Sequence, residues 1–454
     1  MVETSIGIDD IAVYVPHLYL NLNGEFTESR KVDPRKLASL GVSKMGVPDS
    51  HEDSVTMAAN AALKLIKKNN LSPEEIGRIH VGTETQVDHS KPVGSYVLGC
   101  LEKDLGEGSL RHCLVPGDAI FACLGASGAL LDTLNWIRAG ANDGKAGIVI
   151  ATDIAKYETH SSGEYTQGAG AVAMLVRENP TLLSIERPVG VCTKDERDFF
   201  KPLHRTTPVV DGKYSNRCYL DTMKSAFVDY RAKALRAGLV KLANGEALTD
   251  HIEHLAFHQP YPKMTVYAAA FLFRHEWRGL PRWQQIVRQI GYEPGKEHFQ
   301  TDDEFWTADD QWRRRFTEET DQFKEAFNSK VQSSQEASRI VGNIYTGSMY
   351  LGFASMLEYG EHGPFDSVGF GSYGSGCGAL AFRGTLQHDH SSVAGSLGLR
   401  SMLEQRREVS LEQYGALHEG KANGSIVKPH DEFALVGIGK EGCEEGLRFY
   451  EFVK

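Results

Sequence analysis

A cysteine, a glutamate and a histidine in this sequence have residue types and settings that suit acyl-transfer chemistry. Cys123 lies in FACLGASG, where an apolar run gives way to small residues that could begin a helix. Unpaired backbone N–H groups at a helix N-terminus favour a thiolate, so this setting predicts a lowered pKa and a nucleophilic sulfur. The alternative is that Cys123 is a small buried hydrophobe, which is the usual role of a free cysteine.

The glutamate and the histidine could manage protons and charge. Glu84 follows a short apolar segment, IHVGT, and His258 lies in AFHQPYPKM, where two prolines keep the following backbone extended. A thiol suits thioester exchange, a carboxylate can remove a weakly acidic methyl proton, and an imidazole can donate to an oxygen on which charge builds. The three groups together suit acyl transfer followed by carbon–carbon bond formation. Taken singly, Glu84 could be a solvated surface group and His258 a histidine without a catalytic task.

Three more residues have settings that could bind a substrate. Lys263 could hold an anion, and Asn343 in GNIYTGS and Ser375 in GSYGSGCG lie in small-residue turns that could bind a carbonyl or an acyl chain. The simpler alternatives are a solubilising role for the lysine and tight packing between strands for the turns.

The predicted elements place these residues at strand ends. Apolar patterns predict an N-terminal strand over residues 6–14, a helix over 54–69 and strands over 79–83, 110–115, 147–152 and 169–176, with a helix after Cys123. The order of strand, helix, strand and strand recurs at residues 254–258, 345–358, 367–371 and 378–382. This recurrence predicts an α/β fold of two pseudo-duplicated halves, residues 1–190 with the cysteine and residues 191–454 with the histidine.

Three segments fall outside that repeat. Residues 195–219 are irregular and are expected to be a loop outside the core, followed by an amphipathic helix over 221–244. Residues 274–339 carry four of the five tryptophans among many charges, which predicts a helical insertion in the second half whose role could be oligomer contact, substrate lid or padding. The tail, residues 388–454, is expected to pack against the body.

Composition narrows the possible partners and the compartment. At 454 residues the chain exceeds the length of one hydrophobic core, and its net charge of −11 argues against a general nucleic-acid binder. The seven cysteines are scattered, with neither a disulfide framework nor a metal-ligand spacing. The sequence shows no signal-peptide pattern and no long apolar stretch. We therefore expect a cytoplasmic protein with no metal and no nucleic-acid or membrane partner.

Taken together, the motifs resemble the 3-hydroxy-3-methylglutaryl-CoA (HMG-CoA) synthase family of the thiolase superfamily. The matching segments, in the family's order over about residues 6 to 380, are GIDDIAVYVP, VGTET, FACLGAS, IATDIAKY, GEYTQGAGAVAML, DFFKP, PVVDGKYS, FHQPYPKM, VGNIYTGSMYLGFASMLE and GSYGSG. One such segment is weak, whereas the whole set is highly specific. The resemblance implies the five-layered α-β-α-β-α thiolase fold and a homodimer.

The resemblance also implies a reaction and its residues. Cys123 is acetylated by acetyl-CoA, Glu84 removes a methyl proton from the acetyl-enzyme, and His258 helps to position and polarise acetoacetyl-CoA. Aldol addition and hydrolysis then release HMG-CoA and CoA, as in the mevalonate route to isoprenoids. No cofactor is implied beyond the CoA thioesters themselves. The implied binding residues are Lys263 for CoA, and Thr166, Asn343 and Ser375 for the acyl pocket.

Two departures from the family pattern leave alternatives open. Leu124 follows the nucleophile where many members have an aromatic residue, and residues 274–339 are longer than in compact bacterial members. Glu84 separates the chain from ketoacyl synthases, which have no matching glutamate. The alternatives are a polyketide β-branching HMG synthase that acts on a β-ketoacyl carrier protein, and a non-catalytic thiolase-fold scaffold whose insertion binds a partner.

Overall fold

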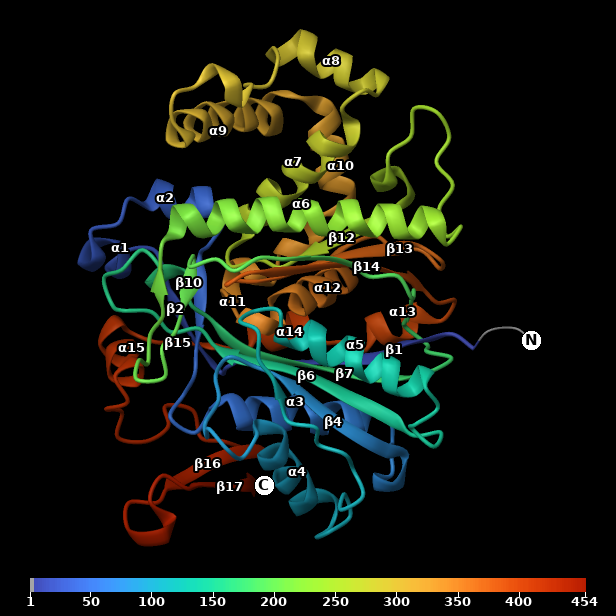
Figure 1. The fold of residues 1–454 in the computed structure, drawn as a ribbon. Helices are drawn as coiled ribbons and strands as arrows, with labels where there is room; N and C mark the ends of the chain where they lie inside the picture. Colours follow the sequence, from blue (N-terminus) through green and yellow to red (C-terminus); the bar gives the residue numbers. More distant parts are fainter. Residues whose placement is uncertain (1–3) are drawn as a thin grey trace.

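Five alternating layers of helices and strands make up the body of the protein, seen here in a computed structural model that describes residues 4–454 (Figure 1). Ten strands are hydrogen-bonded to one another. Nine of them form a path in the order β12-β13-β14-β8-β1-β7-β6-β4-β5, and β9 pairs with β14 beside this path. The two ends of this path lie in separate layers, and helices α5 and α12 fill the space between them. The structure therefore confirms the predicted fold class.

The first layer of strands belongs to the N-terminal half. In this layer β4 pairs in parallel with β5 and β6, whereas β7 is antiparallel to β6 and β1. Helix α3 begins at a capping box made by Asp53 and Thr56, and it packs with α4 on the outer face while α5 covers the inner face. The elements are β1 (Ile6–Tyr14), α3 (Ser54–Lys68), β4 (Ile76–Gly82), α4 (Val93–Leu105), β5 (Asp118–Ala119), α5 (Gly125–Arg138), β6 (Ala146–Ile154) and β7 (Ala169–Glu178).

The second layer repeats this arrangement. Strand β12 pairs in parallel with β13, and β14 is antiparallel to β13 and to the short strands β8 and β9. Helices α6 and α7 cover its outer face, and α12 its inner face. The elements are β8 (Leu183–Ile185), β9 (Gly190–Thr193), α6 (Gly212–Arg236), β12 (His254–Phe257), α7 (Pro262–Trp277), α12 (Ser348–Tyr359), β13 (Ser367–Gly374) and β14 (Gly378–Leu386). The order inferred from the sequence is thus present in both layers, while the division at residues 190 and 191 stays a prediction.

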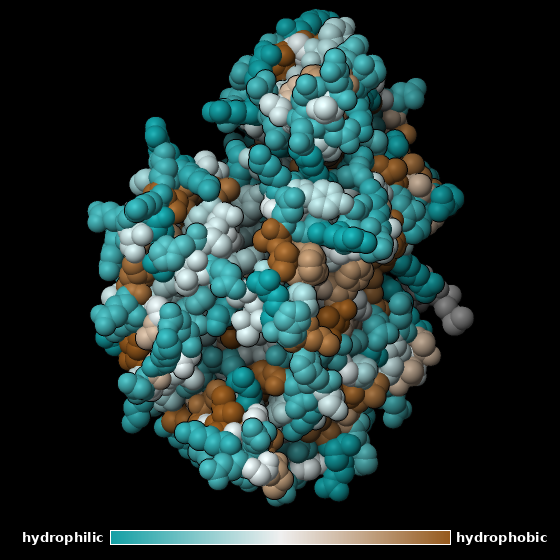
Figure 2. All heavy atoms as spheres, turned by 60° about the vertical axis from the view of Figure 1, so that its left-hand side comes forward, coloured by the Kyte–Doolittle hydropathy of each residue, from teal (hydrophilic) through white to brown (hydrophobic). Residues whose placement is uncertain are grey.

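The tryptophan-rich segment forms a helical lobe above the second layer (Figures 1 and 2). Its helices are α8 (Pro281–Ile290), α9 (Asp302–Glu319) and α10 (Asp321–Lys330), and α11 (Ser338–Val341) returns the chain to the body. Trp283, Trp312 and Phe316 are buried against one another, with ring centroids 5.4–6.3 Å apart. These tryptophans therefore form the core of the lobe. Figure 2 shows that the outer surface of this lobe is mostly hydrophilic.

Smaller elements from both ends of the chain flank the body. Strands β2, β3 and β15 form one small sheet, β10 pairs with β11, and β16 pairs with β17 in a C-terminal hairpin beside α3 and α4. The tail packs against the body, as expected. The bounds are β2 (Leu18–Asn21), α1 (Glu25–Arg30), α2 (Pro34–Leu40), β3 (Lys44–Val47), β10 (Phe199–Phe200), β11 (Val209–Val210), α13 (His390–Gly395), α14 (Leu399–Glu404), β15 (Arg407–Glu408), α15 (Leu411–His418), β16 (Glu432–Ile438) and β17 (Arg448–Val453).

Three sequence-based expectations were wrong in detail. Residues 110–115 form turns with a single bridge at Leu114, and the strand before Cys123 is the two-residue β5. Helix α6 begins at Gly212 because Asp211 caps it, nine residues before the predicted start at 221. The connector is partly core, since Asp198 is fully buried and accepts hydrogen bonds from Ser215 and Tyr373. Among residues 4–454, no helix is long and apolar enough to cross a membrane.

Candidate active site

A tight turn presents Cys123 just before helix α5. Ala122 has a left-handed φ of 42°, and the N–H groups of Leu124 and Gly125 return to the carbonyls of Phe121 and Ala122. A Cβ on Gly125 would lie 2.3 Å from the carbonyl oxygen of Ala119, so this position admits only glycine without rearrangement. The turn thus fixes a half-buried cysteine at the helix start, as predicted.

The carboxylate of Glu84 contacts this thiol directly. Cys123 Sγ donates to Glu84 Oε1 at 3.1 Å, although 39 residues separate the two. The contact follows from packing, because Gly82 at the end of β4 meets the first turn of α5 so closely that a Cβ there would lie 2.3 Å from Ala126 N. Two of the three predicted catalytic residues therefore form one hydrogen-bonded pair.

The protonation of this pair differs from the sequence-based expectation. Burial of the sulfur and the neighbouring Glu84 carboxylate raise the pKa of Cys123 well above its ordinary value. The predicted lowering was wrong because these two effects exceed the stabilisation from the helix start. Burial, followed by the charge of Asp153, also raises the pKa of Glu84. A carboxylate with a raised pKa is a stronger base, so the ionised form of Glu84 binds a proton more tightly than an ordinary glutamate does.

Asp153, at the end of β6, links the segment after β4 to the segment before α12 through its carboxylate. Its carboxylate accepts hydrogen bonds from Thr83 Oγ1 at 3.0 Å, Glu84 N at 2.8 Å and Thr85 Oγ1 at 2.9 Å. It also accepts from the backbone N–H and the hydroxyl of Thr346, just before α12. Burial raises the pKa of Asp153, and the hydrogen bonds from Thr346, Glu84 N and Thr85 oppose that rise by stabilising its charge. Asp153 lies within the motif IATDIAKY, but the sequence alone gave it no predicted role.

His258 lies at the end of β12 in an aromatic setting without charges. Its backbone N–H donates to Gly371 O at 2.7 Å, and its carbonyl accepts from Tyr219 Oη at 2.7 Å. The ring is stacked with Tyr373 at 6.4 Å between centroids, and its Nδ1 is buried without a hydrogen-bond partner. Burial lowers the pKa of His258 to about 3, so the imidazole is neutral.

Strand β13 connects His258 to the cysteine turn. Gly371 holds the His258 backbone and Tyr373 packs on its ring, while a Cβ on Gly374 would lie 2.4 Å from Phe121 O and 2.9 Å from Leu124 N. The His258 strand end and the Cys123 turn thus abut residues 371–374 of one strand. The structure joins all three predicted catalytic residues in one region, with the Cys123–Glu84 pair in direct contact.

The predicted binding residues lie around this region in different settings. Asn343 N donates to Thr166 O at 2.9 Å, so these two residues are neighbours. Their side chains already have local partners: Thr166 Oγ1 donates to Gly163 O, and Asn343 Oδ1 accepts from Tyr345 N and Ser348 Oγ. These local bonds are those of a packed turn, the alternative that the sequence left open for Asn343.

Ser375 and Lys263 are more accessible. Ser375 is half-buried in the turn directly after β13, next to Gly376, whose N–H donates to Asp198. Lys263 is half-buried near the start of α7, with its ammonium 5.6 Å from the centroid of Tyr267. Burial lowers the pKa of Lys263, the carboxylate of Glu318 opposes this shift, and the positive charges of Arg313 and Arg314 add to it. The three cations fit an anionic ligand, with Glu318 as the opposing charge beside them.

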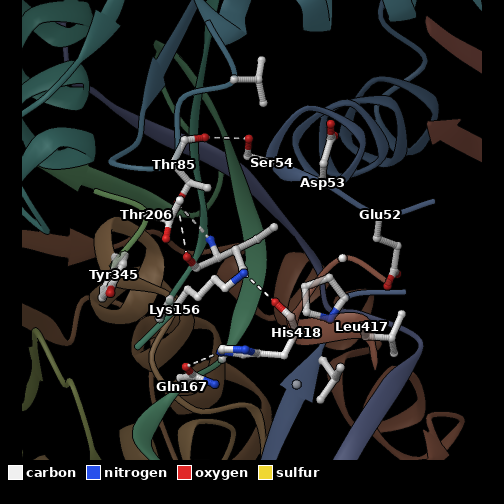
Figure 3. A pocket seen from close by; sticks show the side chains of 18 of the residues that line it. Glu52, Asp53, Ser54, Thr85, Lys156, Gln167, Thr206, Tyr345, Leu417 and His418 are labelled. Atoms are coloured by element: carbon white, nitrogen blue, oxygen red, sulfur yellow. Dashed lines mark hydrogen bonds between the residues drawn. The ribbon is translucent and has the colours of Figure 1, made fainter. Parts of the chain in front are cut away.

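A cavity of about 510 Å³ opens beside Glu84 (Figure 3). Glu84, Thr85 and Tyr345 line one side, and residues of the tail such as Leu417 and His418 line the other. Lys201, also in the lining, donates to Glu84 O at 2.8 Å. In Figure 3 the hydrogen bonds from Lys156 to His418 O and between His418 and Gln167 tie the tail to the body. Lys201 and Tyr345 lie within quoted motifs, DFFKP and VGNIYTGS, but sequence reasoning gave neither a role.

Comparison with known proteins gives one consistent family. The model of the hydroxymethylglutaryl-coenzyme A synthase N terminal matches residues 2–180, and that of the C terminal matches residues 185–427. Hydroxymethylglutaryl-CoA synthase of Haloferax volcanii is 36% identical over 99% of this chain and 100% of its own length. The protein of the same name from Enterococcus faecalis is 31% identical over 91% of each chain.

Solved structures agree with that result. "MvaS in complex with 3-hydroxy-3-methylglutaryl coenzyme A" is similar with a TM-score of 0.83 and 32% identity over the whole of both chains. An HMG-CoA synthase complexed with CoA matches with a TM-score of 0.76 and 27% identity over 99% of this chain and all of its own. A curacin-pathway HMG synthase matches with a TM-score of 0.77, but at 22% identity over 99% of this chain and all of its own, the likeness concerns the fold alone.

Proposed function

The chain belongs to the hydroxymethylglutaryl-coenzyme A synthase family, and from this premise we propose how its own residues carry out the reaction. The protein is an acyltransferase that condenses acetyl-CoA with acetoacetyl-CoA and water to give HMG-CoA and CoA. The observation that carries the residue assignment is the contact of 3.1 Å between Cys123 Sγ and Glu84 Oε1. One member of this pair is a nucleophile and the other is a base already in reach of it.

The first step is the transfer of an acetyl group to Cys123. The thiol proton moves along the existing hydrogen bond to Glu84 as sulfur attacks the thioester carbonyl of acetyl-CoA. The departing CoA sulfur takes this proton from Glu84, so CoA leaves as its thiol and Glu84 is ionised again. Because the raised pKa of the thiol disfavours a free thiolate, the attack and the proton transfer are coupled. The backbone N–H of Cys123 lies against its own sulfur and stabilises negative charge there.

The second step needs a base next to the new thioester. Ionised Glu84 removes a proton from the methyl group of acetyl-Cys123, and the resulting carbon nucleophile adds to the 3-keto carbon of acetoacetyl-CoA. The former keto oxygen takes this proton from Glu84 and becomes the 3-hydroxyl group. The raised pKa of Glu84 supplies the basic strength that a weakly acidic methyl group demands. Water then cleaves the Cys123 thioester, which releases HMG-CoA and frees the sulfur.

His258 stabilises the oxygen of acetoacetyl-CoA on which charge develops. With its pKa lowered to about 3 the ring is neutral, so it can donate one N–H without carrying a charge into the pocket. Its Nδ1 has no hydrogen-bond partner among residues 4–454, and an unpaired buried polar group costs about 1–3 kcal/mol. A substrate oxygen or a bound water that pairs with this ring would remove that cost.

Substrate binding is assigned to four further residues. Lys263, with Arg313 and Arg314 nearby, is the proposed contact for the phosphates of CoA. Ser375, Asn343 and Thr166 line the acyl pocket in this proposal, with Asn343 and Thr166 acting through the backbone and the shape of their turn, because their side chains bond locally.

We further propose a cytoplasmic homodimer that pairs through the β5 edge of the sheet. Strand β5 ends the strand order, and Leu114, Ile120 and Phe121 beside it are 46%, 56% and 37% exposed. Apolar side chains along an open strand edge are a surface that a second copy can cover. Sedimentation of Ile120→Asp tests this: a monomer supports the proposal, and a dimer as stable as the wild type contradicts it.

The assignment of Cys123 is tested by mass spectrometry after incubation with acetyl-CoA. We expect one acetyl group on the Cys123 peptide and none in Cys123→Ala. Addition of acetoacetyl-CoA should consume the adduct and yield HMG-CoA, faster than with a β-ketoacyl carrier protein as the acceptor. A folded protein that remains unmodified supports the scaffold alternative, and a preference for the carrier protein supports the polyketide alternative.

A further inference from the structure

Two histidines and two glutamates converge where the C-terminal hairpin meets the body. His17 follows β1, His51 and Glu52 precede α3, and Glu432 begins β16. His17 Nε2 lies 2.9 Å from both carboxylate oxygens of Glu432, and His51 Nε2 lies 3.5 Å from Glu432 Oε1. His17, His51 and Glu52 each offer one ligand atom, a ring nitrogen or a carboxylate oxygen, and these three atoms lie within 4.8 Å of one another.

The orientation of His51 points its reactive nitrogen into this cluster. Its Nδ1 lies 2.9 Å from Ser425 Oγ, whereas its Nε2 is buried without a hydrogen-bond partner and the residue is 3% exposed. Histidines that bind metals commonly use the second ring nitrogen to bond a neighbour, which fixes the tautomer and the direction of the first. The Ser425 contact supplies that arrangement.

The charges around the cluster favour a cation. Glu52 and Glu432 both accept from Tyr14 Oη at 2.8 Å, which offers a single proton between two carboxylates. The nearby acids Asp49 and Asp53 also have partners: Asp49 accepts from the N–H groups of residues 50, 426 and 427 and lies 4.0 Å from His51 Nδ1, and Asp53 caps α3 and pairs with Arg448. The two buried glutamates therefore face the imidazoles of His17 and His51.

We propose that His17, His51, Glu432 and Glu52 form a binding site for a divalent transition-metal ion of the zinc type. Bonds of about 2.0–2.1 Å in a tetrahedral site place ligand atoms about 3.3 Å apart, and the separations of 2.9 and 3.5 Å lie on either side of that value. Mixed imidazole and carboxylate donors favour zinc, cobalt and nickel over magnesium and calcium. The ion reaches the site through His17, whose side chain is 37% exposed.

The proposed metal site borders the cavity that opens beside Glu84, because Glu52 also lines that cavity. It joins the loop after β1, the start of α3 and the hairpin of β16 and β17, which lies beyond the family match ending at residue 427. A bound ion would hold the hairpin against the body and so raise the resistance of the protein to unfolding. The sequence did not indicate it, because its ligands are separated by up to 415 residues and the expectation of no metal rested on the cysteine spacing.

The test uses full-length protein stripped with a chelator and then dialysed against Zn²⁺ alone. We expect one Zn²⁺ per chain in the wild type with a rise in Tm, and an affinity at least about 10-fold weaker in His51→Gln and in Glu432→Gln. The matched control His298→Gln removes an exposed histidine of the lobe and should bind as the wild type does. Co²⁺ in place of Zn²⁺ should give visible bands without thiolate charge transfer, unchanged in Cys443→Ser.

The outcomes separate cleanly. A wild type that binds no Zn²⁺ overturns the proposal, and so does equal binding by His51→Gln and the wild type. If His51→Gln does not fold, His17→Gln replaces it, since His17 is half-buried at the surface; undiminished binding in that variant contradicts the proposal. Thiolate bands that disappear in Cys443→Ser would assign the metal to that exposed cysteine and reject the cluster.

Discussion

The two halves of the protein contain the same backbone turn before their central helices and use it differently. Ala122 and Tyr345 both have a φ of 42°, and the next residues, Cys123 and Thr346, lie two positions before α5 and α12 respectively. Cys123 points its thiol at Glu84, whereas Thr346 donates its hydroxyl to Asp153. The comparison teaches that the duplicated fold supplies the position and that the side chain decides between chemistry and structure.

The strand ends differ in the same way. Strand β4 leads to Glu84, which is half-buried, and strand β12 leads to His258, which is buried. Burial disfavours the charged form of each, so it raises the pKa of the acid and lowers the pKa of the base. The N-terminal half therefore provides the group that takes a proton, and the C-terminal half provides a neutral group that donates a hydrogen bond.

The largest effect should come from removing the thiol of Cys123, which distinguishes the turn before α5 from the turn before α12. Cys123→Ala leaves no nucleophile, so we expect condensation to fall by about 10³-fold or more and the acetyl adduct to vanish. The control Cys113→Ala removes another half-buried cysteine and should keep nearly full activity. Condensation by folded Cys123→Ala at a rate near that of the wild type would contradict the account; coupled assay of CoA release measures it.

Glu84→Gln should separate the acetylation of Cys123 from the condensation step. The amide cannot take the methyl proton, so we expect condensation to fall by about 10²–10⁴-fold. The thiol keeps a neighbour able to accept a hydrogen bond, so self-acetylation by acetyl-CoA should persist. Stopped-flow measurement of HMG-CoA formation, beside the yield of adduct, checks both. Full condensation by this variant would remove Glu84 from the mechanism.

His258→Asn should slow the condensation with acetoacetyl-CoA and leave the acetylation of Cys123 intact. We expect a fall of about 10–10³-fold in kcat/KM for acetoacetyl-CoA, since one donor to a developing charge is lost. The rate of self-acetylation should change little. His254→Asn removes a buried histidine at the other end of β12 and serves as the matched control. An equal loss in both half-reactions would contradict the division of roles.

The pH dependence should report the acid of the first half. Glu84 acts as a base only when ionised, so the condensation rate should rise with pH through its raised pKa and then level off. Asp153→Asn removes the negative charge that helps to raise this pKa, so the rising limb should move to lower pH. A profile of kcat against pH for both proteins checks this. A limb that stays in place would show that Asp153 does not act on Glu84.

The smallest effect should come from the turn that has no reactive side chain. Thr346→Val removes one donor to the buried carboxylate of Asp153, so we expect unfolding to become easier by about 1–3 kcal/mol. Condensation should fall only a few-fold. Thr133→Val is the control, because that buried hydroxyl donates to a helical carbonyl and not to an acid. Denaturant unfolding measures the difference, and equal stabilities of the two variants would contradict the role of Thr346.

Local patterns predicted the regular elements and the reactive residues. The strand of residues 6–14 has the predicted bounds, and the helix begun at residue 54 ends within one residue of the prediction. Small residues around Cys123 and the strand before Glu84 were visible because each depends on neighbours in the sequence. Their direct contact is a tertiary fact that the pattern alone could only suggest.

The sequence could not predict how residues far apart in the chain change one another's pKa, burial and hydrogen bonding. The thiol pKa was predicted with the wrong sign, since burial and a carboxylate 39 residues away outweigh the helix start. Asp153 gained its role from Thr346, which is 193 residues away, and Asp198 became core through Tyr373, which is 175 residues away. The local sequence around a single acid or hydroxyl in a strand-end loop does not show which distant residue it contacts in the folded sheet.

The central claim is that sulfur carries the acetyl unit while the adjacent carboxylate moves the protons, and following the acetyl adduct in time tests it most directly. Protein acetylated with acetyl-CoA and freed of excess reagent is mixed with acetoacetyl-CoA, and the Cys123 peptide is weighed at intervals. The account predicts that the wild-type adduct decays as HMG-CoA appears and that the Glu84→Gln adduct persists. An adduct that decays at the same rate in both, or one located on another residue, would contradict it.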